Sequence, residues 1–173
     1  ETVSNTGCKT FIIHARKAWL KGLSPKQNRE IPELNYDRVY QLKKDFPELE
    51  IIINGGISSI QDSVDHLHQL DGVMIGREAY TNPYLLAEVD QKIYGKEKSI
   101  INREEIAEKF CQYVDNEMAK GEKLHSMTRH ILGLFRGVKG AKQFRRHISE
   151  NAQGDKASIS VLYDALKKVG EIS

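Results

Sequence analysis

Glu50–Ser59 reads EIIINGGISS, an apolar run that ends in two glycines and two hydroxyl residues. A continuous β-branched run bounded by turn residues is typical of a strand buried on both faces. Glycine lets the backbone turn sharply and approach a ligand closely, and Ser58 or Ser59 can cap a helix that begins near Ile60. The stretch therefore predicts a strand, a tight turn and a helix in succession.

Asp71–Arg77, DGVMIGR, repeats this design with an apolar strand, a glycine and then a cation. In a (β/α)8 barrel, phosphate binds at the turns that follow the last two parallel strands. Glycines at the ends of those strands leave backbone N–H groups free to bind it. Arg77 would add a charge-assisted hydrogen-bond donor. We therefore predict a phosphate site around Gly55 and Gly76. Two ordinary turns of an α/β protein are the alternative.

A third apolar strand is expected at Thr10–His14, ahead of these two. Helical periodicity begins near Asn35, and Asn82-Pro83 suits the start of another helix. The resulting β-α-β-α-β-α order predicts parallel strands with right-handed crossovers. Three strands cannot close a barrel, because two sheet edges and an inner face would stay open. We therefore expect this chain to be the C-terminal part of a larger enzyme. The alternative is an open sheet that a helix or a partner chain covers.

Beyond a polar stretch at Gly95–Ser99 the pattern becomes wholly helical. Asn102 and Glu105 form a capping-box-like start. Four amphipathic segments follow, with apolar stripes that run from Ile106 to Met118, Leu124 to Phe135, Ala141 to Ile148 and Ile159 to Val169. We expect an α/β fold in which a partial (β/α)8 barrel, residues 1–97, precedes a small all-α helical bundle, residues 98–173.

The charge of the 173-residue chain is nearly balanced at +2, but the cations gather in two places. The loop Arg16–Arg29 has five basic and no acidic residues, together with Trp19, and such a loop suits a polynucleotide. The segment Lys120–His147 is also basic, and Lys142, Arg145 and Arg146 share one helix face. The two clusters indicate nucleic-acid binding. Solvated surface segments are the alternative for each cluster.

Few other residues are candidates for catalysis or ligand binding. His14 ends its strand at the rim that holds the two glycine turns, where it could contact a cofactor or phosphate or be structural. Cys8 and Cys111 form no disulfide framework, which fits a reducing, cytoplasmic compartment. Neither cysteine is placed as a nucleophile or proton donor. No metal site is expected, and no apolar run approaches the length of a membrane span.

Several motifs resemble tRNA-dihydrouridine synthases. The run His14–Arg29, HARKAWLKGLSPKQNR, is similar to the A subfamily in particular, as is Arg129–Phe135, RHILGLF, followed by Gly140–Arg146, GAKQFRR. The turns INGGI and IGR with the later NPYLL also match the family. The resemblance implies an FMN-binding (β/α)8 barrel followed by a helical tRNA-binding domain. It also implies NADPH-driven reduction of the uridine C5–C6 bond in the tRNA D-loop, at positions 20 and 20a.

The resemblance assigns roles to residues of this sequence. His14 would contact the flavin. The FMN phosphate would be held by Asn54, Gly55, Gly56, Gly76 and Arg77. Contacts to tRNA would come from Lys26, Arg29, Lys142 and Arg145. Position 142 is one where the subfamily is expected to have arginine, and lysine keeps the charge but loses the bidentate fork.

The proton-donating cysteine of the family has no counterpart here. We expect it, with the earlier barrel strands, upstream of this sequence, and we expect these 173 residues alone to be inactive. The partners expected are tRNA and either the rest of the barrel or a second chain over the open sheet. Two other functions remain open, a different FMN barrel oxidoreductase that acts on a small molecule and a cofactor-free RNA-binding module.

Overall fold

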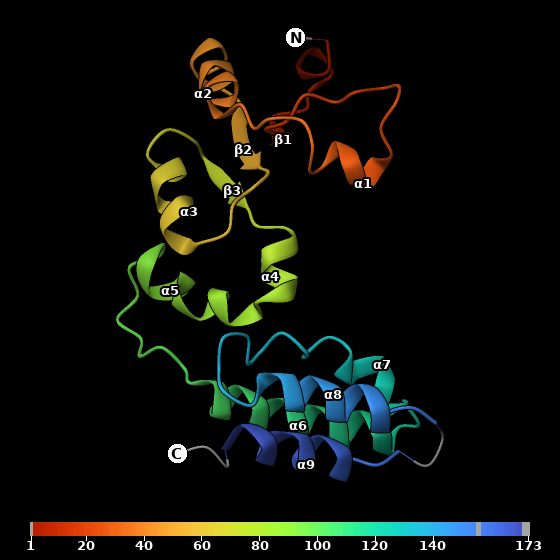
Figure 1. Ribbon diagram of the computed structural model, residues 1–173. Coiled ribbons are helices and arrows are strands. Elements are labelled where there is room, and N and C mark those ends of the chain that lie inside the picture. The colour runs from red at the N-terminus through yellow and green to blue at the C-terminus, as the bar shows by residue number, and fades with distance from the viewer. Residues whose placement is uncertain (1, 155–156, 171–173) are drawn as a thin grey trace. The chain divides into compact units, whose positions relative to one another are not determined.

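The computed structural model describes residues 2–154 and 157–170. Contacts between Cα atoms divide the chain into two compact units, Glu1–Glu78 and Ala79–Ser173. We describe each unit by itself (Figure 1). This division lies earlier than the domain boundary expected after residue 97, and it groups residues 79–97 with the helices that follow.

The first unit contains a parallel three-stranded sheet, as the sequence predicts. Its strands are β1 (Thr10–His14), β2 (Glu50–Asn54) and β3 (Gly72–Met74), in the spatial order β1-β2-β3. In the register of the sheet His14 pairs with Asn54, and Asn54 pairs with Met74. The carboxyl ends of all three strands therefore meet at one edge of the sheet.

The two faces of this sheet differ in burial. Ile51 and Ile53 of β2 are buried in a cluster that also contains Val39 of α2 (Tyr36–Asp45). On the opposite face Ile12 is 56% exposed and Met74 is 42% exposed. The prediction that β2 is buried on both faces is wrong for this structure, in which burial alternates along the strand.

Two helices of the first unit begin at side-chain caps, close to the starts that the sequence predicts for them. The Asn35 side chain accepts a hydrogen bond from the backbone N–H of Arg38 at the start of α2. Ser59, rather than Ser58, caps α3 (Ile60–Leu67), in a reciprocal capping box with Asp62. Each cap satisfies backbone donors that have no partner within their helix.

Two short helices of the first unit were not expected. They are the 3₁₀ helix η1 (Ser4–Thr6) and α1 (Pro25–Asn28) within the basic loop. Ser24 and Gln27 form a capping box at α1, with Pro25 in the first turn. The loop that follows β1 is therefore partly folded rather than extended.

The second unit is helical. Its elements are η2 (Pro83–Glu88), α5 (Val89–Lys92), α6 (Arg103–Ala119), α7 (Leu124–Thr128), α8 (Ala141–Asn151) and α9 (Ser160–Gly170), while α4 (Arg77–Thr81) crosses the division between the units. The helix expected from Asn82-Pro83 begins there as a 3₁₀ helix. The helix expected to continue to Phe135 ends at Thr128, and turns follow it.

The core of the second unit lies between α6, α8 and α9, which run side by side in Figure 1. Val114, Phe144 and Leu162, one from each helix, are fully buried. Gly140 precedes α8 with φ +87°, and a Cβ there would collide with the backbone carbonyl of Lys168 in α9. None of the helices in the described parts of the chain is both long and apolar enough to cross a bilayer.

Candidate functional site

The carboxyl edge of the sheet brings several predicted site residues together. His14, Asn54 and Met74 end the three strands in register, and the Asn54 side-chain amide lies 3.4 Å from the Met74 sulfur. A Cβ built on Gly55 would lie 3.2 Å from two atoms of the His14 ring. The imidazole therefore lies directly beside the turn that follows β2.

The turn after β2 requires both of its glycines. Gly55 and Gly56 have φ values of +115° and +76°, which side chains of L residues rarely adopt. The Tyr36 hydroxyl donates a 2.9 Å hydrogen bond to the Gly55 carbonyl oxygen, and a Cβ on Gly56 would lie 2.8 Å from the same hydroxyl. By contrast, no atom lies within 4 Å of a Cβ built on Gly76. The backbone after β3 therefore borders open space.

Arginine charges act on His14 at this edge. Burial lowers the pKa of His14, and the charges of Arg16, Arg77 and Arg29 lower that pKa further. The imidazole is consequently biased towards its neutral form. Such an environment favours an anion.

The Arg77 guanidinium has partners in the loop that follows β1. Its Nη1 forms a 2.9 Å ion pair with Glu30, and its Nη2 donates to the Arg29 carbonyl oxygen at 3.4 Å. Both side chains of the ion pair are substantially exposed, and pairs of that kind contribute little to stability.

Together these features fit a phosphate group. Open space beside Gly76, a tight glycine turn after β2 and arginine charges are present at the same edge of one sheet. Phosphate binding to backbone N–H groups needs this close approach of the main chain. Asn54, Gly55, Gly56, Gly76 and Arg77 are thus suitable residues to hold the phosphate of a cofactor, with His14 beside them.

Lys26 and Arg29 lie on the folded part of the basic loop. Lys26 belongs to α1 and Arg29 follows its last residue. The Asn28 side chain accepts a 2.8 Å hydrogen bond from the Trp19 backbone N–H and donates one of 2.9 Å to the Trp19 carbonyl oxygen. The loop thus presents two cations and a half-exposed indole on a defined backbone.

Lys142 and Arg145 are exposed on α8, on which Phe144 is buried. Arg146, which was expected to share their role, forms a 2.7 Å ion pair with Glu150. Arg146 therefore has a partner on its own helix. Lys142 and Arg145 remain the cations that α8 offers to a partner.

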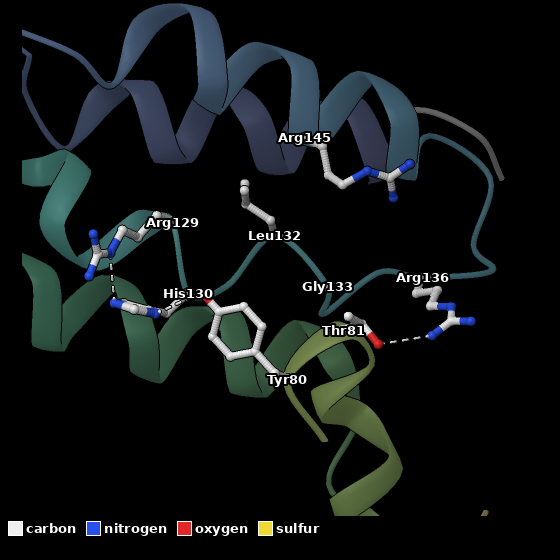
Figure 2. A pocket seen from close by; sticks show the side chains of 8 residues that line it. All are labelled: Tyr80, Thr81, Arg129, His130, Leu132, Gly133, Arg136 and Arg145. Atoms are coloured by element: carbon white, nitrogen blue, oxygen red, sulfur yellow. Dashed lines mark hydrogen bonds between the residues drawn. The ribbon is translucent and has the colours of Figure 1, made fainter. Parts of the chain in front are cut away.

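Arg145 also borders a cavity of about 390 Å³ within the second unit (Figure 2). The other lining residues are Tyr80, Thr81, Arg129, His130, Leu132, Gly133 and Arg136. The sequence indicates the arginines as members of a basic segment. It contains no local signal that would place Tyr80 beside them.

Comparisons with known proteins agree on one family. A family model described as dihydrouridine synthase (Dus) matches residues 1–170. The chain is 57% identical over 163 residues to a tRNA-dihydrouridine(20/20a) synthase of Vibrio vulnificus (strain CMCP6), which covers 94% of this chain and 50% of that protein. Identity is 54% over 169 residues to the enzyme of that name from Shewanella oneidensis (strain MR-1), covering 98% of this chain and 50% of that protein.

A protein with the same name from Escherichia coli (strain K12) is 53% identical over 171 residues, which cover 98% of this chain and 50% of that protein. The chain thus spans about half the length of the curated relatives it matches.

Proposed function

This chain belongs to the dihydrouridine synthase (Dus) family, and we propose that it acts in the FMN-dependent reduction of uridine to dihydrouridine in tRNA. The substrate uridines would be those at positions 20 and 20a of the D-loop, NADPH would be the reductant, and the reaction would occur in the cytoplasm. The register of the sheet, which gathers His14, Asn54 and both glycine turns at one edge, is the observation that carries this proposal.

The proposed architecture is the end of a barrel followed by a tRNA-binding helical domain. β1, β2 and β3 would be the last three strands of a (β/α)8 barrel within residues 1–97, and residues 98–173 would form the helical domain. Exposed Ile12 and Met74 support this assignment, because the inner face of a barrel strand packs against side chains from the other strands. The rest of the barrel or a second chain would cover that face.

Bound FMN would supply the hydride for one carbon of the uracil C5–C6 bond. Asn54, Gly55, Gly56, Gly76 and Arg77 would hold its phosphate, through backbone N–H groups and the guanidinium. His14 would contact the flavin. Its lowered pKa favours a neutral ring that donates a hydrogen bond from one nitrogen and accepts one at the other.

The reduction also requires a proton at the second uracil carbon, and neither cysteine is positioned to deliver it. Cys8 precedes β1, so it lies towards the edge opposite the glycine turns. Cys111 is buried in the helical core, where burial and Glu108 raise the pKa of its thiol. We therefore propose that another part of the protein donates the proton and that these 173 residues alone do not reduce uridine.

Two groups of cations would bind tRNA. Lys26 and Arg29 lie on the loop after β1, and Lys142 and Arg145 lie on the exposed side of α8. Neutralising backbone phosphates with such side chains makes the affinity depend steeply on salt. Binding by these residues should therefore weaken as the salt concentration rises.

The test uses the full-length protein and two measurements, bound flavin by absorbance and tRNA affinity by filter binding. Lys142→Glu with Arg145→Glu should weaken tRNA binding at least tenfold and leave the flavin content unchanged. Lys92→Glu with Lys109→Glu changes the formal charge equally at two surface ion pairs and is the matched control.

Loss of flavin in the α8 double variant, or equal weakening by the control pair, would contradict the assigned surface. Wild-type protein that binds tRNA but contains no flavin would instead be an RNA-binding module. Protein that contains flavin but does not bind tRNA would be an FMN oxidoreductase for a small molecule.

A further inference from the structure

A second cavity, of about 760 Å³, lies in the first unit at the loop that follows β1. Lys17 and Trp19 line it from the start of the loop, and residues 31–37 line it from the other end. Its volume falls within the range of small-molecule sites, about 300–1,000 Å³. Leu34 joins it to the candidate phosphate site, because a Cβ built on Gly55 would lie 3.3 Å from the Leu34 Cδ2.

Hydrogen bonds of the main chain hold together the two segments that border this cavity. Arg16 and Leu34 form an isolated antiparallel bridge. The backbone N–H of Asn35 donates a 2.8 Å hydrogen bond to the carbonyl oxygen of Ala15. Arg16 also donates from Nη1 to the carbonyl oxygen of Pro32. The two ends of the loop are therefore joined beside the cavity.

Trp19 has a fixed backbone and an accessible ring. The Asn28 side chain bonds both polar groups of the Trp19 main chain, at 2.8 and 2.9 Å. Trp19 is nevertheless 50% exposed, and the neighbouring Leu20 is 95% exposed. Ordering an indole, which has only two side-chain torsions, costs little conformational entropy. The ring is therefore suited to stacking against a flat partner.

The cavity also has polar groups that complement a nucleotide. Glu33 and Asp37 line it, and neither carboxylate has an ion-pair partner within the described parts of the chain. Ionised carboxylates only accept hydrogen bonds, so they suit the amino and ring N–H groups at the edge of a base. Lys17 offers the opposite charge to a phosphate.

We propose that this cavity takes one unstacked nucleotide of an RNA strand, with its base against the Trp19 indole. Proteins recognise single-stranded RNA by stacking splayed-out bases on aromatic side chains and by bonding the polar edges of those bases. Glu33 and Asp37 would accept hydrogen bonds from the base, and Lys17 would pair with its phosphate.

The carboxylates select the kind of base. Uracil has one N–H between two carbonyl groups, which repel a carboxylate, whereas adenine, cytosine and guanine each carry an amino group. The occupant is therefore a different nucleotide from the uridine that is reduced. The inference rests on the proposed tRNA substrate and adds a base contact to the phosphate contacts proposed above.

The first experiment measures the tRNA affinity of the full-length protein by filter binding. Trp19→Ala should weaken binding about tenfold and Trp19→Phe about threefold, because phenylalanine keeps a smaller stacking face. Tyr163→Ala removes a ring of similar exposure, 49%, from α9 and is the control. It should change the affinity by no more than about twofold.

The two carboxylates give a second experiment whose sign is decisive. Glu33→Gln with Asp37→Asn removes two negative charges, which by itself strengthens binding to a polyanion. The proposed hydrogen bonds predict the opposite, an affinity about tenfold lower. Asp45→Asn with Glu48→Gln removes the same charge at the far end of α2 and should not weaken binding.

Indole fluorescence reports the stacking independently of affinity. The emission that full-length wild-type protein shows and Trp19→Phe lacks comes from Trp19. Added tRNA should quench this emission, because a base stacked on an indole quenches its fluorescence. Equal quenching of wild type and Trp19→Phe would contradict the stacked base.

The outcomes separate this site from the proposed function. If wild-type protein binds tRNA and the cavity variants behave like their controls, the site is wrong while the proposed function stands. If wild-type protein binds no tRNA, the proposed function fails and the site fails with it. If NADPH quenches the Trp19 emission and tRNA does not, the cavity takes the reductant, and the RNA proposal is overturned.

Discussion

The hydroxyl of Tyr36 donates a 2.9 Å hydrogen bond to the carbonyl oxygen of Gly55. This contact joins the first residue of α2 to the turn after β2 and fixes the orientation of the Gly55 peptide. The His66 ring packs edge-on against Tyr36, with 4.6 Å between the ring centroids. Burial and the Asp62 carboxylate raise the pKa of Tyr36, so its hydroxyl stays protonated as a donor.

Tyr36→Phe should therefore loosen the proposed phosphate turn while it preserves the packing of the ring. We expect the free energy of unfolding to fall by about 1 kcal/mol, measured by denaturant titration of the full-length protein. We also expect the FMN affinity to fall several-fold, measured by flavin fluorescence. Tyr163→Phe, at a half-exposed tyrosine of α9, is the control. Equal FMN affinity in Tyr36→Phe and wild type would show that this hydroxyl does not position the turn.

Arg77→Ala should raise the pKa of His14 and reduce FMN retention. The positive charge of Arg77 disfavours the imidazolium, so its removal stabilises the protonated ring. An NMR titration of the His14 ring protons, together with flavin content after dialysis, would measure both effects. Arg38→Ala on α2 should change neither. Full flavin occupancy at low free FMN in Arg77→Ala would remove this residue from the phosphate site.

Asp71→Asn should destabilise the protein at neutral pH and much less in acid. The Asp71 carboxylate lies 2.8 Å from Lys43 Nζ and accepts a 2.8 Å hydrogen bond from the backbone N–H of Ile51. Burial alone would raise the pKa of Asp71, but these partners outweigh burial and lower it. The carboxylate therefore stabilises the fold above its unfolded-state pKa, and that contribution is lost as pH falls through the lowered value.

We expect Asp71→Asn to lower the free energy of unfolding by about 1–2 kcal/mol at pH 7, a modest figure because solvent screens the partly exposed pair. The difference from wild type should shrink towards pH 3 in urea titrations at a series of pH values. Asp45→Asn, at an exposed aspartate that ends α2, is the control. A difference that stays constant from pH 7 to pH 3 would contradict an electrostatic role.

Gly133→Ala should destabilise the second unit, because the new methyl group would meet the Thr81 backbone. Overpacking of this kind costs about 1–3 kcal/mol. Gly121→Ala meets open space and carries only the strain of its positive φ, so it is the comparison. Thermal unfolding should rank Gly133→Ala as the less stable variant. The reverse order would mean that residues 81–83 shift away easily.

The sequence predicted the helices and strands that local interactions determine. Asn35 and Ser59 cap helices through their own side chains, and the three strands stand out as apolar runs. The capping box of Ser24 and Gln27 is an equally local signal for α1, but α1 spans only four residues, too few to show apolar periodicity.

Long-range contacts account for the differences between the predicted and the observed structure. The apolar periodicity continues past Thr128, where α7 ends, and it does not reveal the close approach of Gly133 to Thr81. The burial of Ile51 but not of Ile12 depends on which face of the sheet α2 covers. The pairing of Arg77 with Glu30 likewise joins residues far apart in the sequence, so no motif could predict it.

Gly140 should restrict which mutations the gene can accept at this position. Its missing side chain lets the start of α8 rest against the main chain of Lys168, and any missense change in the first two bases of a glycine codon introduces a side chain. Codon 140 should therefore tolerate almost no drift in a randomly mutagenised population that is selected for folded protein. Survivors that do change it should harbour a second alteration near the end of α9.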